Sequence, residues 1–250
     1  MRNSLFSVLL ACFLAPGFAT SFSAQAQTAP PLAPAKMRAD AVTRTLTLPP
    51  FDGVAVQVLA RVELSEGSTP KVEVTGPRKL ISQLQAEVQN GTLRLYFHGA
   101  KPHFHKKRNL RIVITASAFK ILTMRGAGDF TGLTPLTAPE LEIAIAGAGH
   151  ATLAVQNQRT RVAISGAGNV TLNGRTSTQD VRISGAGNYR AYELQSLDAT
   201  ASISGVGNQE LTATNSLDAR ISGIGNIRYR GQPARLTRRV SGAGKVEPDN

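Results

Sequence analysis

The sequence predicts an all-β protein whose main part is a single-stranded, right-handed parallel β-helix, a solenoid with coils of about 19 residues. Three observations support this prediction. A Gly-x-Gly motif recurs, with its first glycine at positions 126, 147, 166, 185, 205, 223 and 242. Apolar residues precede each copy at fixed positions. Each repeat is too short for a helix plus turns, and its frequent Gly, Thr and Asn are poor helix formers.

The residues before each glycine predict a strand with one buried face. Two positions before the first glycine stand Met124, Ile145, Ile164, Ile183, Ile203, Ile221 and Val240. Two positions earlier stand Leu122, Ile143, Val162, Val181, Ala201 and Ala219, and Arg238 breaks this series in the last unit. Because the residues between them are mostly polar or small, the period of two indicates a half-buried strand in every coil.

A second series follows the glycines and predicts a polar ladder. Three residues after the first glycine stand Asp129, His150, Asn169, Asn188, Asn208, Asn226 and Lys245. Asparagine tolerates the left-handed conformation of a sharp corner, and stacked Asn amides can hydrogen bond from coil to coil. We therefore expect Asn169, Asn188, Asn208 and Asn226 to form a structural corner ladder. A nucleotide-binding glycine loop would occur once, before a helix.

The N-terminal portion, residues 45–125, is predicted to be β-rich with one short helix. The alternating apolar residues of Val54–Leu64 indicate one long strand, and residues 71–75, 109–115 and 119–125 indicate shorter ones.

The helix of this portion is expected to begin at Pro77, since proline suits a first helical turn. One helical face would carry Leu80, Ile81, Leu84 and Val88. Asn90-Gly91 then predicts a tight hairpin turn into a strand over Thr92–Phe97.

The first residues predict export. Residues 1–26 have the pattern of a signal peptide, with an A-x-A site that places cleavage after Ala26. A lipoprotein site at Cys12 is the alternative, weakened because the apolar run continues past it. Residues 27–44 read as a Pro/Ala-rich linker, 126–246 as the repeat portion and 247–250 as a tail. No transmembrane segment is expected, and the predicted location is the periplasm or the cell surface of a bacterium.

These features together resemble the bacterial GIN-domain family, which is described as the head domain of auto-transporter adhesins. The resemblance rests on the signal peptide, the strand after Phe51-Asp52-Gly53, the helix PRKLISQL and the reiterated Ser-Gly-x-Gly-Asn. It extends over roughly Thr45 to Val246. The resemblance implies a secreted or periplasmic single-stranded β-helix without assigned catalysis.

The net charge of +12 points to an anionic partner. Residues 27–125 hold 15 Lys and Arg against 6 Asp and Glu, and the basic residues are densest in 98–111. The candidate anion-binding residues are Lys101, His103, His105, Lys106, Lys107 and Arg108. The predicted partners are anionic polysaccharide, lipopolysaccharide or a membrane surface. Nucleic acid is less favoured, because aromatic residues make up only 5% of the chain. The sequence does not indicate an oligomeric state.

Catalytic and metal sites receive weaker support. His103-x-His105 could hold a metal, but the neighbouring cations would repel it, so no metal or other cofactor is expected. The outward carboxylates Glu142, Asp180 and Asp218 alternate with other residue types in the intervening coils and do not converge. The sequence therefore favours a non-catalytic binding or adhesion module of the cell envelope. The alternative is a polysaccharide-active enzyme, a lyase or hydrolase, on the same scaffold.

Overall fold

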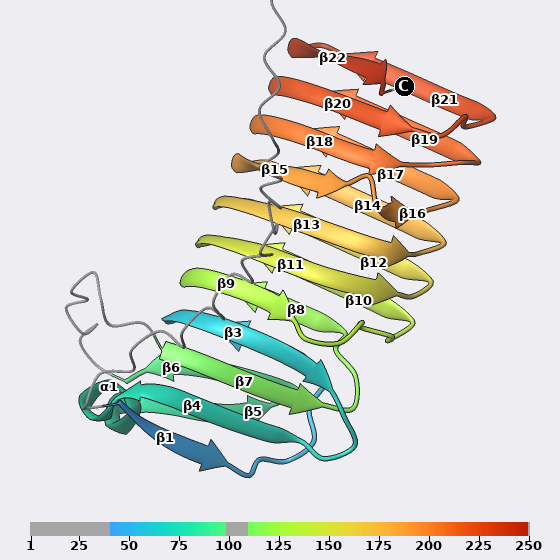
Figure 1. Ribbon diagram of the computed structural model, residues 1–250. Coiled ribbons are helices and arrows are strands. Elements are labelled where there is room, and N and C mark those ends of the chain that lie inside the picture. The colour runs from blue at the N-terminus through green and yellow to red at the C-terminus, as the bar shows by residue number, and fades with distance from the viewer. Residues whose placement is uncertain (1–40, 99–109, 250) are drawn as a thin grey trace, which may run out of the picture. The chain divides into compact units, whose positions relative to one another are not determined.

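The computed structural model describes residues 41–98 and 110–249, which fall within one compact unit (Figure 1). Two long sheets run through this unit. Sheet A contains β1 (Ala41–Leu46), β3 (Leu59–Glu66), β4 (Lys71–Pro77), β7 (Leu110–Ala116), β9 (Ala127–Gly132), β11 (Ala148–Gln156), β13 (Ala167–Arg175), β15 (Ala186–Ala191), β16 (Leu194–Gln195), β18 (Val206–Thr212), β20 (Ile224–Arg230) and β22 (Ala243–Pro248).

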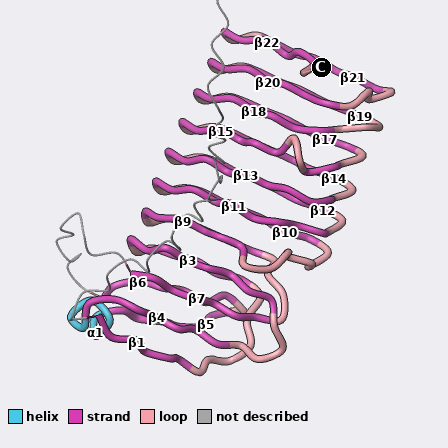
Figure 2. The backbone as a smooth tube through the Cα atoms, in the orientation of Figure 1, coloured by secondary structure: helices cyan, strands magenta, loops and turns pink. Residues whose placement is uncertain are grey.

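Sheet B lies on the other side of the coils. It contains β2 (Gly53–Val56), β5 (Leu84–Gln89), β6 (Thr92–Phe97), β8 (Ile121–Met124), β10 (Glu140–Ile145), β12 (Arg159–Ile164), β14 (Thr178–Ile183), β17 (Asp198–Ile203), β19 (Ser216–Ile221) and β21 (Arg235–Val240). The single helix among the described residues is α1 (Arg78–Gln83), drawn in cyan in Figure 2.

One coil consists of a sheet B strand, a two-residue turn and a sheet A strand. In the coil of β12 and β13, the turn is Ser165-Gly166. Successive coils pair in parallel and in register, so that Ile164 lies beside Ile183 and Asn169 beside Asn188. The predicted all-β solenoid with coils of about 19 residues is therefore confirmed. The sequence pattern indicated one strand per coil, whereas the structure has two.

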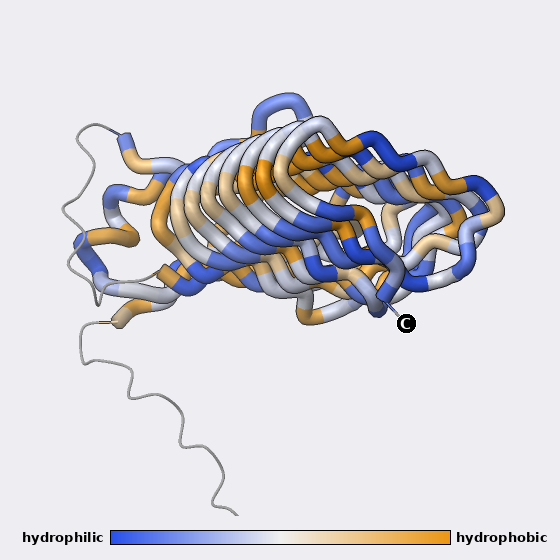
Figure 3. The backbone as a smooth tube through the Cα atoms, turned by 90° about the horizontal axis from the view of Figure 1, so that it is seen from above, coloured by the Kyte–Doolittle hydropathy of each residue, from blue (hydrophilic) through white to orange (hydrophobic). Residues whose placement is uncertain are grey.

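The core lies between the two sheets. Inward residues of sheet B, such as Ile164 and Ile183, face inward residues of sheet A, such as Val170 and Leu172, and all four are at most 2% exposed. Seen from above, the hydrophobic segments of consecutive coils follow one another along the stack (Figure 3). Because each coil buries its apolar residues between its neighbours, stability is shared along the stack.

The repeated glycines are required by close stacking of the coils. A Cβ atom on Gly185 would lie 2.1 Å from the carbonyl oxygen of Gly166, and one on Gly187 would lie 2.0 Å from that of Gly168. The expectation that asparagines adopt a left-handed corner is wrong. Among the described residues, the non-glycine residue with a positive φ is Asn90, and the ladder asparagines lie inside sheet A strands.

The predicted long strand Val54–Leu64 is also wrong in one respect, since it is divided between the sheets. β2 pairs with β8 in sheet B, and β3 pairs with β9 in sheet A, so this stretch turns a corner at Gln57-Val58 and forms a complete coil. The alternation of apolar residues continues through the corner, and for that reason it could not reveal the turn.

The N-terminal end of the unit departs from the repeat. Strands β1, β4 and β5 pair antiparallel with their neighbours, and α1 packs on β1 and β4 with Leu80 and Ile81 buried. The helix ends at Gln83, earlier than predicted, so that Val88 belongs to β5. Asn90 and Gly91, with φ of 49° and 71°, form the predicted hairpin turn between β5 and β6.

At the other end, β21 and β22 form the last coil, and every residue of β21 is exposed. Arg238 occupies an inward position there. Its guanidinium donates a hydrogen bond to the Tyr229 hydroxyl (2.5 Å) and lies 5.6 Å from the centre of that ring. The arginine therefore covers an aromatic residue of the preceding coil, and β21 stays in register with β19 throughout.

Candidate functional site

The outward residues of β12, β14, β17, β19 and β21, here called the sheet B face, differ from coil to coil. They form three rows that cross the strands. The first row is Arg159, Thr178, Asp198, Ser216 and Arg235. The second row is Arg161, Asp180, Thr200, Asp218 and Thr237. The third row is Ala163, Arg182, Ser202, Arg220 and Arg239.

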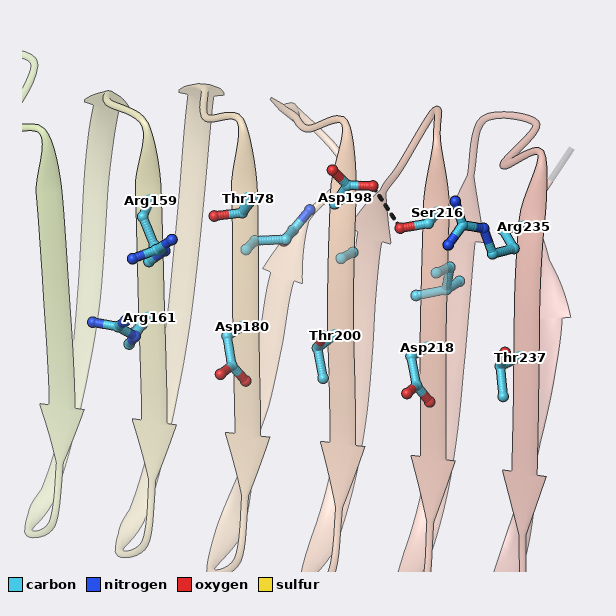
Figure 4. Close-up of a pocket in the computed structure, with 13 residues that line it drawn as sticks. Arg159, Arg161, Thr178, Asp180, Asp198, Thr200, Ser216, Asp218, Arg235 and Thr237 are labelled. Atoms are coloured by element: carbon cyan, nitrogen blue, oxygen red, sulfur yellow. Dashed lines mark hydrogen bonds between the residues drawn. The ribbon is translucent and has the colours of Figure 1, made fainter.

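The first two rows line a shallow concavity of about 430 Å³ (Figure 4). In the figure, each strand contributes one side chain to each row. The floor is formed by the inward residues Gln179, Ala199 and Leu217. The lining contains arginine, aspartate and hydroxyl groups together, which suits a polar ligand with several hydroxyl or acidic groups.

Ion pairs fix several of these side chains. Arg182 Nη2 forms an ion pair with Asp180 Oδ2 on its own strand (2.8 Å), and Arg220 donates a hydrogen bond to Asp218 Oδ2 at the equivalent place. At one border, Glu140 of β10 binds Arg159 at 2.8 Å and Arg161 at 3.5 Å.

At the opposite border, Arg235 and Arg239 have no ion-pair partner among the described residues. The positive charge of the face is therefore least compensated at β21.

Asp198 occupies the middle of the first row. The Ser216 hydroxyl (2.5 Å) and the Asn215 side-chain amide (2.7 Å) both donate to Asp198 Oδ1. These two hydrogen bonds, that of Ser216 first, hold the pKa of Asp198 below its usual value. The carboxylate is therefore a fixed negative charge between the two outer arginines.

The carboxylates of the second row are not arranged as a catalytic pair. Asp180 and Asp218 are separated by a whole coil that carries Thr200, and each is already bonded to an arginine. Their other oxygens, Oδ1, are covered and have no hydrogen-bond partner among the described residues. Within those residues, no group of three or more His, Cys, Asp or Glu side chains is placed to hold a metal ion.

The four ladder asparagines lie in one row on the outer face of sheet A. Asn188 Nδ2 donates to Asn169 Oδ1 (2.8 Å), Asn208 Nδ2 to Asn188 Oδ1 (3.2 Å) and Asn226 Nδ2 to Asn208 Oδ1 (3.3 Å). Because every amide donates toward the N-terminal end, the row has one direction.

The ends of this row are also bonded. Asn169 Nδ2 lies 3.1 Å from His150 Nδ1, and the backbone amide of Lys245 donates to Asn226 Oδ1 (3.1 Å). The asparagine side chains thus bond mainly with one another, and the row helps to hold successive coils together.

A buried polar cluster inside the solenoid was missed in the sequence. The Tyr189 hydroxyl donates to Gln179 Oε1 (3.0 Å), and Gln179 Nε2 donates to Ser196 Oγ (2.7 Å) and to the Thr212 carbonyl oxygen (3.0 Å). Burial raises the pKa of Tyr189. The signal was available, since Gln179 stands at an inward position of its strand. The polar groups of Gln179 all bond within this cluster, so that Gln179 has no donor left for a ligand.

The predicted anion-binding residues Lys101, His103, His105, Lys106, Lys107 and Arg108 lie outside the described residues, as do Ala26 and the signal peptide. The flanking strands are described. β6 ends at Phe97 in sheet B and β7 begins at Leu110 in sheet A. In the repeat coils, two residues make this connection, so residues 98–109 are an insertion between strands of one coil.

A second basic cluster, Arg228, Arg230, Arg235, Arg238, Arg239 and Lys245, is divided by the structure. Arg228 pairs with Glu247 (3.2 Å), and Arg230 pairs with Asp249 (2.9 Å) and stacks 4.1 Å from the centre of the Tyr192 ring. Burial raises the pKa of Tyr192 to about 12. These arginines stabilise the final coils, whereas Arg235 and Arg239 point outward from the sheet B face.

Among the described residues, no helix has the length and apolar character needed to cross a membrane. A family model described as "putative auto-transporter adhesin, head GIN domain" matches residues 50–233. No curated protein matches the sequence.

Several solved structures share the fold. One from Bacteroides fragilis, described as a putative adhesin, is 25% identical with a TM-score of 0.81, over 85% of this chain and 98% of that chain. One from Parabacteroides distasonis, described as a putative lipid-binding protein, is 23% identical with a TM-score of 0.67, over 85% and 98%. One from Parabacteroides merdae, described as a putative adhesin, is 24% identical with a TM-score of 0.62, over 85% and 97%.

Proposed function

Because the chain belongs to the family described as the head GIN domain of putative auto-transporter adhesins, we propose that it is an exported, non-catalytic module that binds anionic glycans or lipopolysaccharide at the cell envelope. Family membership and the adhesin descriptions of structural neighbours support a role in adhesion. Lipopolysaccharide is included because the charge of the chain favours anionic partners, and one structural neighbour is itself described as a putative lipid-binding protein.

The observation that carries the anionic part of this proposal is the charge of the sheet B face. Its three rows hold six arginines against three aspartates, with Arg235 and Arg239 unpaired among the described residues. A surface with such an excess attracts polyanions, and the attraction weakens as salt screens it.

The basic segment before the repeats extends the proposal. In the sequence, no carboxylate occurs between Glu87 and Asp129, whereas the candidate anion-binding residues fall within this stretch: Lys101, His103, His105, Lys106, Lys107 and Arg108. We propose that these six side chains supply a second contact with the same polyanion.

The test is a binding array of acidic glycans, neutral glycans and lipopolysaccharide at low and moderate salt. We expect binding to acidic probes that weakens roughly tenfold as salt rises from about 50 to 300 mM, because the contact is electrostatic. Replacing the six basic-segment residues with Ala or Ser should weaken binding further. Equal binding to neutral and acidic probes, insensitive to salt, would contradict the proposal.

The enzyme alternative can be tested on the same samples. The observation in its favour is that Asp180 and Asp218 lie in one row of an open concavity. Incubation with acidic glycans, with and without calcium, should yield no new reducing ends and no unsaturated products. Accumulation of either product would replace the binding role with a hydrolase or a lyase.

A further inference from the structure

Two strands of the sheet B face carry the same outward triad of a hydroxyl, a carboxylate and a guanidinium. On β14 the triad is Thr178, Asp180 and Arg182, and on β19 it is Ser216, Asp218 and Arg220. The inward neighbours differ between the two strands, being Gln179 and Val181 on one and Leu217 and Ala219 on the other. The likeness is therefore among the outward side chains.

The strand between them has a different pattern. β17 presents Asp198, Thr200 and Ser202 at the same register positions, so it offers no cation. The two triads therefore lie two coils apart. With strands about 4.8 Å apart, their separation is about 9.6 Å along the solenoid axis. This length is close to one disaccharide of an extended polysaccharide chain.

In each triad the arginine is held by the aspartate of its own strand and remains exposed to solvent. The Arg182 and Arg220 side chains are 63% and 48% exposed, whereas those of Asp180 and Asp218 are 27% and 34% exposed. In each pair the aspartate contacts one terminal nitrogen of the arginine, Nη2. A guanidinium has five N–H donors, so most of them remain for a planar acceptor such as a carboxylate.

We infer that the sheet B face binds an extended acidic polysaccharide that lies along the solenoid axis and carries one carboxylate on every second sugar. Each disaccharide meets one triad, in which the aspartate orients the arginine, the arginine binds the sugar carboxylate and the hydroxyl binds a sugar hydroxyl. This inference rests on the proposed function and names the class of glycan for it.

The intervening coil supplies the selectivity. A polysaccharide with a carboxylate on every sugar would bring one of them to Ser202, which lies on β17 between Arg182 and Arg220 and offers no cation. A carboxylate held there without a charged partner opposes binding. A neutral chain would leave both arginines without an acidic partner. The expected order of affinity is therefore alternating charge first, then charge on every sugar, then neutral.

The test uses the full exported chain and three sets of oligosaccharides of equal length: hyaluronan, in which alternate sugars are acidic, oligogalacturonate, and chito-oligosaccharides. Binding is measured by titration calorimetry at low salt. We expect hyaluronan tetrasaccharide and octasaccharide to bind tightly and the disaccharide markedly less, because a chain needs two carboxylates one disaccharide apart to reach both triads.

The variant Arg182→Gln/Arg220→Gln should weaken hyaluronan binding roughly tenfold through loss of two charge-assisted contacts. The control Arg175→Gln/Arg190→Gln removes the same charge from two exposed arginines on sheet A strands and should change it less than about twofold. Thermal unfolding of both variants checks that the fold is retained.

A second variant tests directly whether the two-coil spacing of the triads determines the preference. Ser202→Arg places a cation on the intervening coil and should raise the affinity for oligogalacturonate relative to hyaluronan. If both double variants lose affinity equally, or Ser202→Arg leaves the preference unchanged, the alternating template is wrong although polyanion binding stands. If no acidic probe binds the unaltered protein, the proposed function fails as well.

Discussion

Sheet A and sheet B of the same coils differ in how much their outward residues vary. Near the corner, sheet A shows the same residue types from coil to coil, with asparagine at 169, 188, 208 and 226 beside small residues. On sheet B, the corresponding rows mix arginine, aspartate and hydroxyl residues. Repetition on one side and variation on the other indicate that the two faces serve different purposes.

The physical reason lies in what each row contacts. A side chain or glycine in the corner region meets its own copy in the next coil, so the best residue for one coil is the best for all. An outward residue of sheet B pairs with an unlike residue, either on its own strand, as Arg182 and Asp180 do, or on the next strand, as Ser216 and Asp198 do. Its identity is therefore free to vary from coil to coil.

The largest effect is expected from a change in the repeated corner. Gly185→Ala would place a Cβ atom 2.1 Å from the Gly166 carbonyl oxygen and 2.4 Å from that of Ser165, so the backbone of the two coils would have to move apart. We expect a loss of about 3 kcal/mol in the free energy of unfolding, measured by urea denaturation.

Ala186→Val is the matched control for this change. It alters the next residue, which is exposed, to the type found at the same register position in Val206, and it should cost less than about 0.5 kcal/mol. Equal stability of Gly185→Ala and Ala186→Val would remove steric stacking as the reason for the repeat.

An intermediate effect is expected from the polar ladder. Asn188→Ala removes a donor to Asn169 and the acceptor of both Asn208 nitrogens, so we expect a loss of about 1 kcal/mol. Thr171→Ala, in the next row of the same face, serves as the comparison in the same denaturation experiment. A loss no larger than that of Thr171→Ala would mean that the amide bonds contribute nothing beyond ordinary surface contacts.

The smallest effect on stability is expected on the sheet B face. Arg182→Gln/Arg220→Gln breaks two exposed ion pairs, and such pairs contribute little in water. We expect a change below about 1 kcal/mol together with the loss of glycan affinity described above. A large destabilisation would show that this face, too, is built for folding.

Much of the fold could be predicted from the sequence, because every coil repeats the same alternating strand before its glycines. The second strand of each coil could not be predicted so easily. It begins Ala-Gly-Asn in β13 and β15, and both Gly and Asn are depleted in strands, Gly because it has no side chain to pack and Asn because its side chain bonds to nearby backbone and favours turns. Tertiary stacking overrides that preference here, since only glycine fits against the carbonyl oxygen of the coil before it.

The candidate site was harder to predict for a different reason. Asp180 with Arg182 and Asp218 with Arg220 are visible as same-strand pairs in the sequence. Counting back from the repeated glycines also aligns them across coils with Thr200 between the two carboxylates, in agreement with the structure. The contacts of Glu140 with Arg159 and Arg161, and of Asp198 with Ser216 and Asn215, could not be predicted, because they depend on side-chain conformations that the repeat pattern does not determine.

The parallel in-register stacking of coils also makes distances along the molecule discrete. Any two outward groups on one row are separated by a whole number of strand spacings of about 4.8 Å. Insertion or deletion of one coil between two such groups would therefore change the distance between them by about 4.8 Å. The remaining coils would keep neighbours of the same kind. Under the proposed function, the number of coils between two triads would determine the repeat length of the polysaccharide that fits.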